Sequence, residues 1–372
     1  MKTILLIAKT LSLDDGQGRY AHGLIRELSK KYKLIILSGC LEGAEVLDNS
    51  NLEIHKIPDL YVLNSFAGPF IYFFKTLKFY FKADFVHILT DLPYYILFSP
   101  AVWFKIKPLF ITFHGTYGVE HLEKGWKKNI LKAACRKAEK IICVSNFTKN
   151  EILKRADLKN LMVINNGVDY HKWQIDYKTA KPSQKIILGV GALKSRKGYH
   201  ISIPAVAKAK EKYPDLKYYI VGNQGDKNYF QKLKNLIKQN QLENNVIFLE
   251  KIFDKDLILL YYQTDLFLLT SVNIGSKFEG FGLVYLEAGA CGKPVIGAYG
   301  CGAEDAIRDN YNGLLVPQND IEKTAEAILK ILDNQNLAEK MGENGRQRAQ
   351  EMDWSNLIKE YIKTYSSSVF QK

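Results

Sequence analysis

The chain has 372 residues, of which 47% are hydrophobic, 24% charged and 12% aromatic. This length predicts two domains with large cores, and the composition excludes disorder over most of the chain. The net charge is +13, and it is concentrated in residues 1–180, which carry +9 of it. A basic excess attracts nucleic acid, anionic lipid or phosphorylated ligands, and charge alone does not choose among these partners.

The cysteines and the hydrophobic runs indicate in which cellular compartment the protein is expected to work. The five cysteines form no C-x-x-C pair, which argues against a zinc site and a disulfide framework and is typical of a reducing cytoplasm. The apolar run at residues 3–8 is too short for a signal peptide and predicts a first strand. The uncharged run at residues 92–104 is shorter than the roughly 20 residues that a membrane-spanning helix needs. We therefore expect no membrane span.

Short aliphatic and β-branched runs alternate with stretches of helical spacing along the whole chain. The predicted strands are Thr3–Ala8, Lys33–Ser38, Phe85–Leu89, Leu109–Phe113, Lys140–Val144, Lys185–Val190, Lys217–Val221, Val246–Leu249, Leu266–Leu269 and Pro294–Gly297. Such alternation predicts parallel sheets with helices on both faces, and these strands are too many for one sheet at this spacing.

The alternation breaks after the turn signal Asn-Asn-Gly at residues 165–167, where an aperiodic polar stretch follows. We therefore predict two doubly wound α/β domains, residues 1–168 and residues 185–350. The tail, residues 351–372, has helical spacing and is expected to pack back on the first domain. Ligands bind at the carboxyl ends of parallel strands, so function is expected in the loops that follow the strands.

The loop and helix after the strand Leu266–Leu269 carry the most specific pattern. Glycines allow a tight turn there, and the free N–H groups of a helix that begins near Leu283 attract a phosphate. Glu279 and Glu287 flank this point, and carboxylates accept hydrogen bonds from sugar hydroxyls. A plain helix start with solvated glutamates is the alternative, which the combined pattern disfavours. The predicted nucleotide-sugar contacts in this segment are Gly280, Phe281, Gly282, Leu283 and Glu287.

The spacing Glu279-x7-Glu287, within Glu-Gly-Phe-Gly-Leu, resembles the signature of the family-4 retaining glycosyltransferases. The order of features along most of the chain is similar too. The resemblance implies a GT-B fold, with two facing Rossmann-like domains and a cleft between them. It also implies that Glu287 binds the ribose and that the catalytic Glu279 faces the transferred sugar. A covalent intermediate on Glu279 and a front-face displacement both remain open.

The same resemblance also indicates which residues contact the diphosphate leaving group. Lys197, which follows the strand Lys185–Val190, matches the family lysine that contacts the donor diphosphate. Arg196 is expected to assist it, while Ala192 stands where the family often has an arginine.

Two features of the first domain also match the family. Gly16 and Gly18 resemble its glycine loop near the donor phosphates and the acceptor. His114, at the end of the strand Leu109–Phe113, matches a histidine that hydrogen-bonds the donor sugar, and we expect it to be catalytic together with Glu279. His87 also ends a strand and is expected to be a structural or cleft-wall residue.

We expect no metal or other cofactor to be required, because a helix N-terminus and cations can neutralise a diphosphate. Asp254 and Asp256 precede a helical run, where capping of the helix N-terminus by a carboxylate is the commoner role.

Two basic patterns suggest a membrane surface. Lys75, Lys78 and Lys82 recur at helical spacing among aromatic residues. A second pattern repeats every four residues: Lys124, Lys128, Lys132, Arg136 and Lys140. Ordinary helices with lysines facing water are the alternative, and the co-occurrence of both patterns in the more basic half favours peripheral binding to an anionic membrane.

The sequence therefore predicts a retaining hexosyltransferase that uses a nucleotide diphosphate sugar. The second domain binds the donor and the first a glycan or lipid-linked acceptor, in cell-surface polysaccharide or glycolipid synthesis at the inner face of the plasma membrane. The alternatives are an epimerase-like nucleotide-sugar enzyme, a nucleic-acid-binding protein and a silent partner subunit. No nucleic-acid partner is expected, because no recognition motif is found. The sugar, the base and the acceptor remain open.

Overall fold

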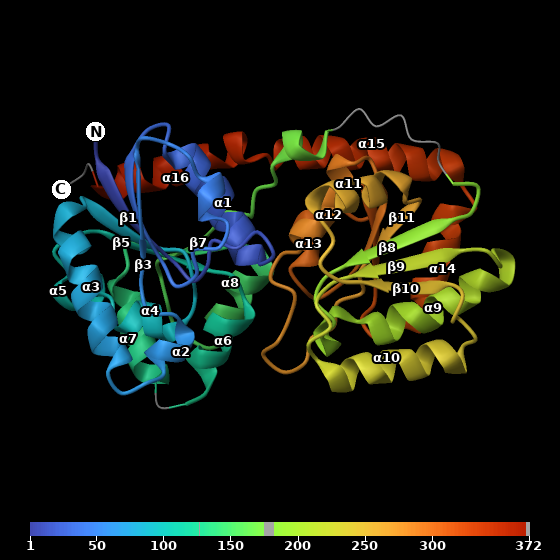
Figure 1. Cartoon of the computed structure of the whole chain (residues 1–372), viewed down its shortest axis with the longest axis horizontal. Coiled ribbons are helices and arrows are strands. Elements are labelled where there is room, and N and C mark those ends of the chain that lie inside the picture. Colours follow the sequence, from blue (N-terminus) through green and yellow to red (C-terminus); the bar gives the residue numbers. More distant parts are fainter. Residues whose placement is uncertain (126, 175–181, 370–372) are drawn as a thin grey trace. The chain divides into compact units, whose positions relative to one another are not determined.

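The computed structural model describes residues 1–125, 127–174 and 182–369. They form two compact units, one made of Met1–Gly167 together with the chain from Trp354 onward, and the other of Val168–Asp353. Each unit is a parallel sheet covered by helices on both faces (Figure 1). The predicted α/β class is confirmed.

The first unit contains a parallel sheet in the order β3-β2-β1-β4-β5-β6-β7. The strands are β1 (Thr3–Ala8), β2 (Lys33–Ser38), β3 (Leu52–Lys56), β4 (Phe85–Ile88), β5 (Leu109–Phe113), β6 (Lys140–Cys143) and β7 (Leu161–Val163). Ile4 of β1 lies between Leu34 of β2 and Phe85 of β4. The chain thus builds outward from β1 in one direction and from β4 in the other, which creates a topological switch point between these strands.

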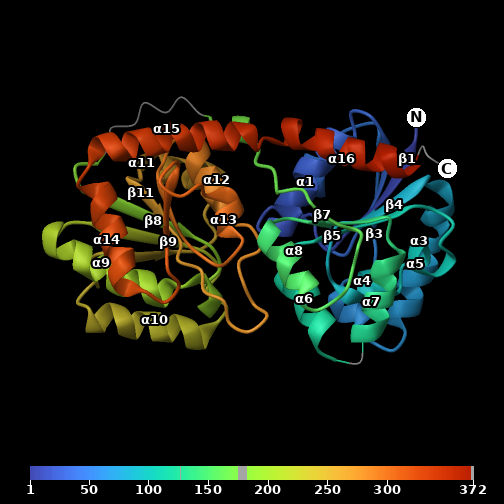
Figure 2. The same cartoon turned by 180° about the vertical axis from the view of Figure 1, so that it is seen from behind.

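Helices cover both faces of this sheet. They are α1 (Gly16–Leu28), α2 (Leu60–Leu63), α3 (Gly68–Lys82), α4 (Pro93–Leu97), α5 (Pro100–Phe104), α6 (Thr116–Glu123), α7 (Lys128–Lys137), α8 (Asn146–Leu153) and α16 (Trp354–Val369), with a short 3₁₀ turn at Ala44–Val46. Alternate residues of β1, Ile4, Leu6 and Ala8, pack in the core beneath α1 and α16. Helices α3, α4, α5 and α7 lie on the other side of the sheet (Figures 1 and 2).

Helix α16 is tied to the first sheet by a buried polar network. The hydroxyl of Tyr361 lies 2.9 Å from that of Tyr20, and the hydroxyl of Tyr365 lies 2.7 Å from Nδ1 of His87. Thr112 connects these two hydrogen-bonded pairs. Its Oγ1 lies 3.0 Å from the Tyr20 hydroxyl and 2.8 Å from Nε2 of His87. Burial lowers the pKa of His87 to about 3, so this histidine is a neutral structural residue.

The second unit repeats the plan with the strand order β10-β9-β8-β11-β12-β13, also parallel. Its strands are β8 (Ile186–Val190), β9 (Lys217–Val221), β10 (Val246–Leu249), β11 (Leu266–Leu268), β12 (Val295–Ala298) and β13 (Gly313–Val316). The switch point lies between β8 and β11, which pair through Leu188 and Phe267.

Helices cover the second sheet in the same way. They are α9 (Tyr199–Lys212), α10 (Lys227–Gln239), α11 (Asp254–Gln263), α12 (Leu283–Ala290), α13 (Ala303–Ala306), α14 (Ile321–Leu332) and α15 (Gln335–Glu351), with 3₁₀ turns at Tyr170–Trp173 and Ser195–Lys197. Helices α9, α10 and α14 lie on one side of the sheet, and α11, α12 and α15 on the other (Figures 1 and 2).

Three strands that the sequence did not predict, β3, β7 and β13, all lie at sheet edges. An edge strand has only one neighbour, so it needs less apolar sequence than a central one. The alternating, partly exposed Leu52–Lys56 and the three-residue Leu161–Val163 fit this description. Their hydrophobic signal is too weak to separate them from loops.

The two predicted basic patterns differ in the structure. Lys75, Lys78 and Lys82 lie on one helix, α3, and all three are exposed. The four-residue repeat is wrong as a single stripe. Lys124 ends α6, Gly125 turns the chain at φ 86°, and Lys140 begins a strand, so only the members between them share α7. Among the described helices, none has the length and hydrophobicity needed to cross a bilayer.

Candidate functional site

In the second unit, the loops after β8, β11 and β12 meet at the switch point of the sheet. The backbone N–H of Val272 donates to the carbonyl of Arg196 (2.8 Å), which joins the first two loops. The N–H of Gly302 donates to the carbonyl of Glu279 (2.8 Å), which joins the third. These backbone bonds fix the side chains between the loops, at the edge of the sheet where parallel α/β proteins bind ligands.

A buried ion cluster forms in this place. Nζ of Lys197 lies 2.5 Å and Nη1 of Arg196 3.4 Å from Oε2 of Glu279, and the hydroxyl of Ser271 donates to the same oxygen at 3.3 Å. Glu279 is only 7% exposed. The structure thus brings together three residues that the sequence predicts: Glu279, Lys197 and Arg196.

The charges in this cluster determine its protonation. Burial alone would raise the pKa of Glu279, but the charges of Lys197 and Arg196 outweigh it and lower the pKa to about 2. Burial lowers the pKa of Lys197, and the attraction of Glu279 only partly opposes this. The carboxylate is therefore charged at neutral pH, and its nearest cation is held at a cost in solvation.

The start of α12 lies beside this cluster. Gly282 precedes the helix with φ 86°, and an added Cβ would lie 2.5 Å from the ring of Tyr285, so only glycine fits. Leu283 is half-buried. The first N–H groups of an α-helix have no partner within the helix, and in many proteins they bind anions such as phosphate. The side chain of Phe281 is buried, which leaves its backbone for the predicted contact. Gly280 is in close contact with Gly302, where an added Cβ would meet the Gly280 carbonyl at 2.1 Å.

Glu287 lies inside α12 and is 3% exposed. The hydroxyl of Tyr261, from α11, donates to its Oε2 at 3.2 Å. Tyr261 is a neighbour that the sequence analysis missed. The hydrogen bond orients the carboxylate, and carboxylates are acceptors for sugar hydroxyls. The ribose contact of Glu287 stays a prediction.

The first unit carries its own polar cluster at the switch point between β1 and β4. Nζ of Lys9 lies 2.9 Å from Oδ2 of Asp15, and Oδ1 of the same residue caps α1 by accepting from the N–H of Gln17 at 2.7 Å. The Thr90 hydroxyl, after β4, donates to Oε1 of Gln17 at 3.3 Å. Burial raises the pKa of Asp15, but Lys9 and the Gln17 N–H outweigh it, and the pKa is lowered.

The glycines of this loop are not equivalent. An added Cβ on Gly18 would lie 1.9 Å from the carbonyl oxygen of Ser12, so Gly18 is required by close packing. An added Cβ on Gly16 would have no neighbour within 4 Å. The predicted phosphate contact of both glycines stays a prediction.

His114 is held by a buried carboxylate, Asp91, at the end of β4. Oδ2 of Asp91 accepts from the backbone N–H groups of His114 and Gly115, both at 3.1 Å. Nε2 of His114 lies 3.0 Å from the carbonyl of Leu89, so Nε2 carries the proton and Nδ1 is an acceptor. The edge of the Tyr20 ring packs against the imidazole at 4.7 Å between centroids.

The protonation of this pair is set mainly by burial. Burial raises the pKa of Asp91, while His114 and backbone N–H groups oppose the rise. Burial lowers the pKa of His114, so the imidazole is neutral at neutral pH. Asp91 was missed by the sequence analysis, although it lies two residues after the predicted strand Phe85–Leu89.

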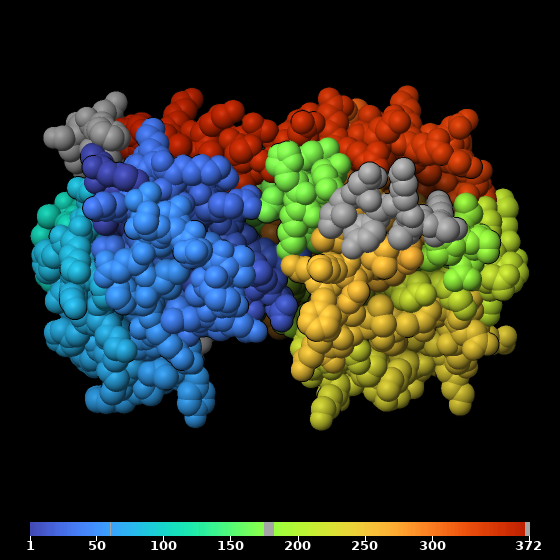
Figure 3. Space-filling model, turned by 45° about the horizontal axis from the view of Figure 1, so that its top comes forward, coloured from blue at the N-terminus to red at the C-terminus, as the bar shows by residue number. Residues whose placement is uncertain are grey.

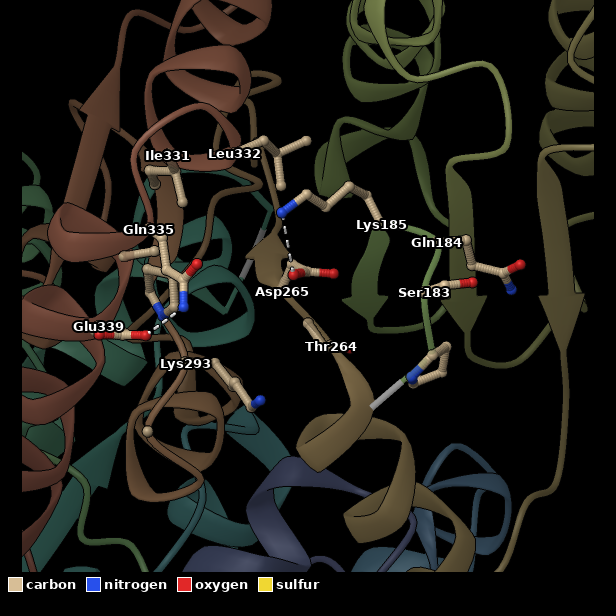
Figure 4. A pocket seen from close by; sticks show the side chains of 14 residues that line it. Ser183, Gln184, Lys185, Thr264, Asp265, Lys293, Ile331, Leu332, Gln335 and Glu339 are labelled. Carbon is tan, nitrogen blue, oxygen red and sulfur yellow. Dashed lines mark hydrogen bonds and ion pairs between the residues drawn. The ribbon is translucent and has the colours of Figure 1, made fainter. Parts of the chain in front are cut away.

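A separate pocket of about 340 Å³ lies in the second unit at the amino ends of β8, β11 and β12, whereas the Lys197–Glu279 cluster lies after their carboxyl ends. Figure 4 shows Lys185, Asp265 and Lys293 around the pocket, with Nζ of Lys185 3.8 Å from Oδ1 of Asp265. Because ligands bind parallel sheets at the carboxyl ends, we do not assign the site to this pocket.

The predicted N-terminal cap of α11 is wrong in detail. Phe253 occupies the cap position without a side-chain hydrogen bond, and Asp254 is paired with Nζ of Lys172 at 2.5 Å. Within the described part of the chain, no three His, Cys, Asp or Glu side chains are grouped as metal ligands.

Two doubly wound units, each with charged residues at its switch point, give the chain the architecture of the GT-B fold. The structure is similar to HepE of Anabaena in complex with UDP and glucose (TM-score 0.81, 20% identity, covering 99% of this chain and 100% of that one). It is also similar to sucrose-phosphate synthase of Thermosynechococcus elongatus (TM-score 0.80, 19% identity, 100% of both chains).

The sequence comparisons agree. Residues 171–348 match the family described as Glycosyl transferases group 1, and residues 15–172 match the one described as Glycosyltransferase Family 4. An uncharacterized glycosyltransferase of Methanocaldococcus jannaschii is 30% identical over 259 residues, which cover 69% of this chain and 68% of that protein. The D-inositol 3-phosphate glycosyltransferase of Corynebacterium urealyticum is 31% identical over 189 residues, 50% of this chain and 43% of its own. The chain belongs to the glycosyltransferases.

Proposed function

We propose that this glycosyltransferase is a retaining hexosyltransferase that uses a nucleotide diphosphate sugar bound by the second unit. The observation that carries the proposal is the Lys197–Arg196–Glu279 cluster beside the start of α12. It offers cations for a leaving diphosphate and an ionised carboxylate for the sugar. HepE has been solved with UDP and with UDP-glucose, which makes UDP-glucose the first donor to test.

Donor binding changes the pairing in this cluster. The diphosphate accepts from the N–H groups at the start of α12 and takes over the cations Lys197 and Arg196, which pair with Glu279 in its absence. As the glycosidic bond to the phosphate breaks, the negative charge of the leaving group grows, and these donors stabilise it.

The released carboxylate of Glu279 then faces the sugar. Its low pKa, about 2, keeps it ionised, so it can act as a nucleophile or stabilise the positive charge that develops on the sugar ring. Both routes lead to retention, and both require the negative charge.

Two further groups are proposed to orient the donor. Nδ1 of the neutral His114 accepts from a sugar hydroxyl, because Nε2 already donates to the Leu89 carbonyl. Glu287, oriented by Tyr261, accepts from the ribose hydroxyls. Gly16 and Gly18 allow backbone contact with phosphates or acceptor.

The reaction is proposed to need no metal, since the cations and the helix N-terminus supply the positive charge. Retained turnover in a chelator supports this, whereas activity lost in the chelator and restored by Mn²⁺ contradicts it.

The acceptor is proposed to be a glycan or a lipid-linked sugar bound by the first unit, in the synthesis of a surface polysaccharide or glycolipid at the inner face of the plasma membrane. Positive charge is concentrated in residues 1–180, and the lysines of α3 are exposed. Both observations support binding of the first unit to an anionic membrane surface.

The direct test measures binding and release of nucleotide. We expect one of the UDP-, GDP- or ADP-sugars to raise the thermal midpoint, and free nucleotide diphosphate to appear with acceptor present. The matched control is Glu343→Gln, an exposed glutamate of α15, which should behave as the wild type. Interconversion of the donor sugar without release of nucleotide would indicate an epimerase and overturn the proposal.

A further inference from the structure

Helices α2, α3 and α5 of the first unit leave large apolar side chains exposed. On α3, Phe70, Phe74 and Phe81 are 61%, 66% and 59% exposed. At 100° per residue they fall within a sector of about 40° on that helix. The other exposed members of this surface, here called the aromatic patch, are Phe66, Trp103, Phe104 and Ile106.

The aromatic patch is continuous. Phe66 lies 6.5 Å from Phe70 between ring centroids, and Phe81 lies 6.1 Å from Phe104. Phe73, between the two groups, lies 5.5 Å from Phe74 and 6.2 Å from Phe104. Atoms of this light-blue segment form part of the surface of the first unit in Figure 3. At about 200 Å² for each large side chain, the patch exposes roughly 900 Å², more than the few hundred Å² typical of a monomer.

Lysines flank the patch. Lys75, Lys78 and Lys82 form a second row on α3, about 90° around the helix from the phenylalanines. Lys105 directly follows α5 and is exposed. Aromatic rings with neighbouring lysines are typical of segments that lie in the interface of an anionic bilayer, where rings enter the acyl boundary and ammonium groups stay at the phosphates.

We propose that the aromatic patch inserts into the interface of an anionic lipid bilayer and that the lysines hold the phosphate headgroups. A second copy of the chain fits this surface less well, because a symmetric contact would bring the two lysine rows near each other. The inference deepens the proposed function, since it identifies the surface through which the first unit reaches a lipid-linked acceptor. It goes beyond attraction by charge, because the apolar rings are the larger part of the contact.

The chain offers a matched comparison in α10. This helix also exposes lysines, Lys227, Lys232 and Lys238, but its apolar residues Tyr229 and Ile237 are buried. Charge alone would make the two helices equivalent, whereas insertion requires α3.

The test is flotation of the purified protein with vesicles of phosphatidylglycerol and phosphatidylcholine. We expect wild-type binding, and a loss on the order of a hundredfold for F70Q/F74Q/F81Q that persists in about 0.5 M salt, because buried apolar area is not screened. K75Q/K78Q/K82Q should lose on the order of a hundredfold at low salt and little at high salt. K227Q/K232Q/K238Q and Phe253→Gln, an exposed ring of the second unit, should bind as the wild type.

A depth measurement covers the case of a misfolded triple variant. Trp103 is 61% exposed, and its fluorescence should be quenched by lipids brominated on the acyl chains, an effect that Trp103→Phe removes. The proposal is overturned if the wild type stays out of the lipid fraction, or if the α10 variant loses binding as the α3 variants do. It is also overturned by a lipid-free dimer that F70Q/F74Q/F81Q disrupts. Vesicle binding needs no donor, so it can fail or succeed independently of donor binding and nucleotide release.

Discussion

The two units place a buried carboxylate at the same topological position, but in opposite electrostatic settings. Asp91 follows β4 in the first unit, and Glu279 follows β11 in the second. Each of these strands pairs with the strand that comes first in the chain within its unit, β1 and β8 respectively. Asp91 accepts mainly from backbone N–H groups, and burial raises its pKa. Glu279 has two cations beside it, and its pKa falls to about 2. One carboxylate therefore serves to hold a loop, and the other to keep a negative charge available.

The difference teaches that position in the fold and chemical role are set separately. Parallel topology brings both side chains to a ligand-binding edge, but only neighbouring charges decide whether a carboxylate is ready for chemistry. Replacement of each carboxylate by its amide tests this directly, because the amide keeps the shape and removes the charge.

Turnover gives the largest expected contrast. Glu279→Gln should lower kcat by about 1,000-fold or more, because the charge that faces the transferred sugar is lost. Donor binding should survive, since the amide leaves Lys197 and Arg196 to the diphosphate. Steady-state kinetics and calorimetry of donor binding measure the two effects. Wild-type kcat in this variant would remove Glu279 from the chemistry.

Stability should separate the same two substitutions. Glu279→Gln leaves the buried Lys197 without its carboxylate and should cost about 3 kcal/mol. Asp91→Asn keeps an acceptor for both N–H groups and should change stability by less than about 1 kcal/mol. The double variant E279Q/K197M should recover most of the first loss, because neither buried charge remains. Urea unfolding measures all three, and equal losses in the two single variants would contradict the contrast.

The loop-holding role of Asp91 predicts an effect on His114. Asp91→Ala removes the acceptor of two buried N–H groups and should cost about 1–3 kcal/mol. It should also raise KM for the donor, because the imidazole loses its fixed position, while Asp91→Asn restores most of that affinity. If the alanine and asparagine variants have the same KM, Asp91 does not position His114.

How much the sequence could predict follows from the same two carboxylates. Glu279 belongs to a dense local pattern with glycines and Glu287, and that pattern was enough to single it out, whereas Lys197 was predicted from the family resemblance. Asp91 is a lone acidic residue after a strand, a common arrangement, and its role depends on His114, 23 residues further along the chain. Contacts between residues so far apart in the sequence are created by the fold, and a single sequence does not reveal them.

The basic patterns show the same limit. The prediction that Lys75, Lys78 and Lys82 share one helix is confirmed, because α3 is continuous over all three. The second repeat crosses Gly125, where the chain turns, and enters β6 at Lys140. Two patterns of helical spacing therefore had different structural outcomes, and local periodicity could not distinguish them. The exposure of the phenylalanines beside the first stripe depends on what α3 packs against, which also required the structure.

The smallest expected effect, and the sharpest test of the contrast, is the pH dependence of stability. The lowered pKa of Glu279 contributes stability that is complete above its ordinary pKa of 4.5 and is lost as the pH falls from there toward 2. The raised pKa of Asp91 acts in the opposite sense, because ionisation above its ordinary value of 3.8 costs stability and protonation at lower pH relieves that cost. The stability deficit of Glu279→Gln relative to the wild type should thus shrink on acidification below pH 4.5. If Asp91→Asn is more stable than the wild type, that gain in the free energy of unfolding should also shrink on acidification. The two differences from the wild type therefore have opposite signs and both move toward zero. Unfolding curves of both variants across this range decide the matter, since deficits of the same sign in both would mean that the two carboxylates share one role.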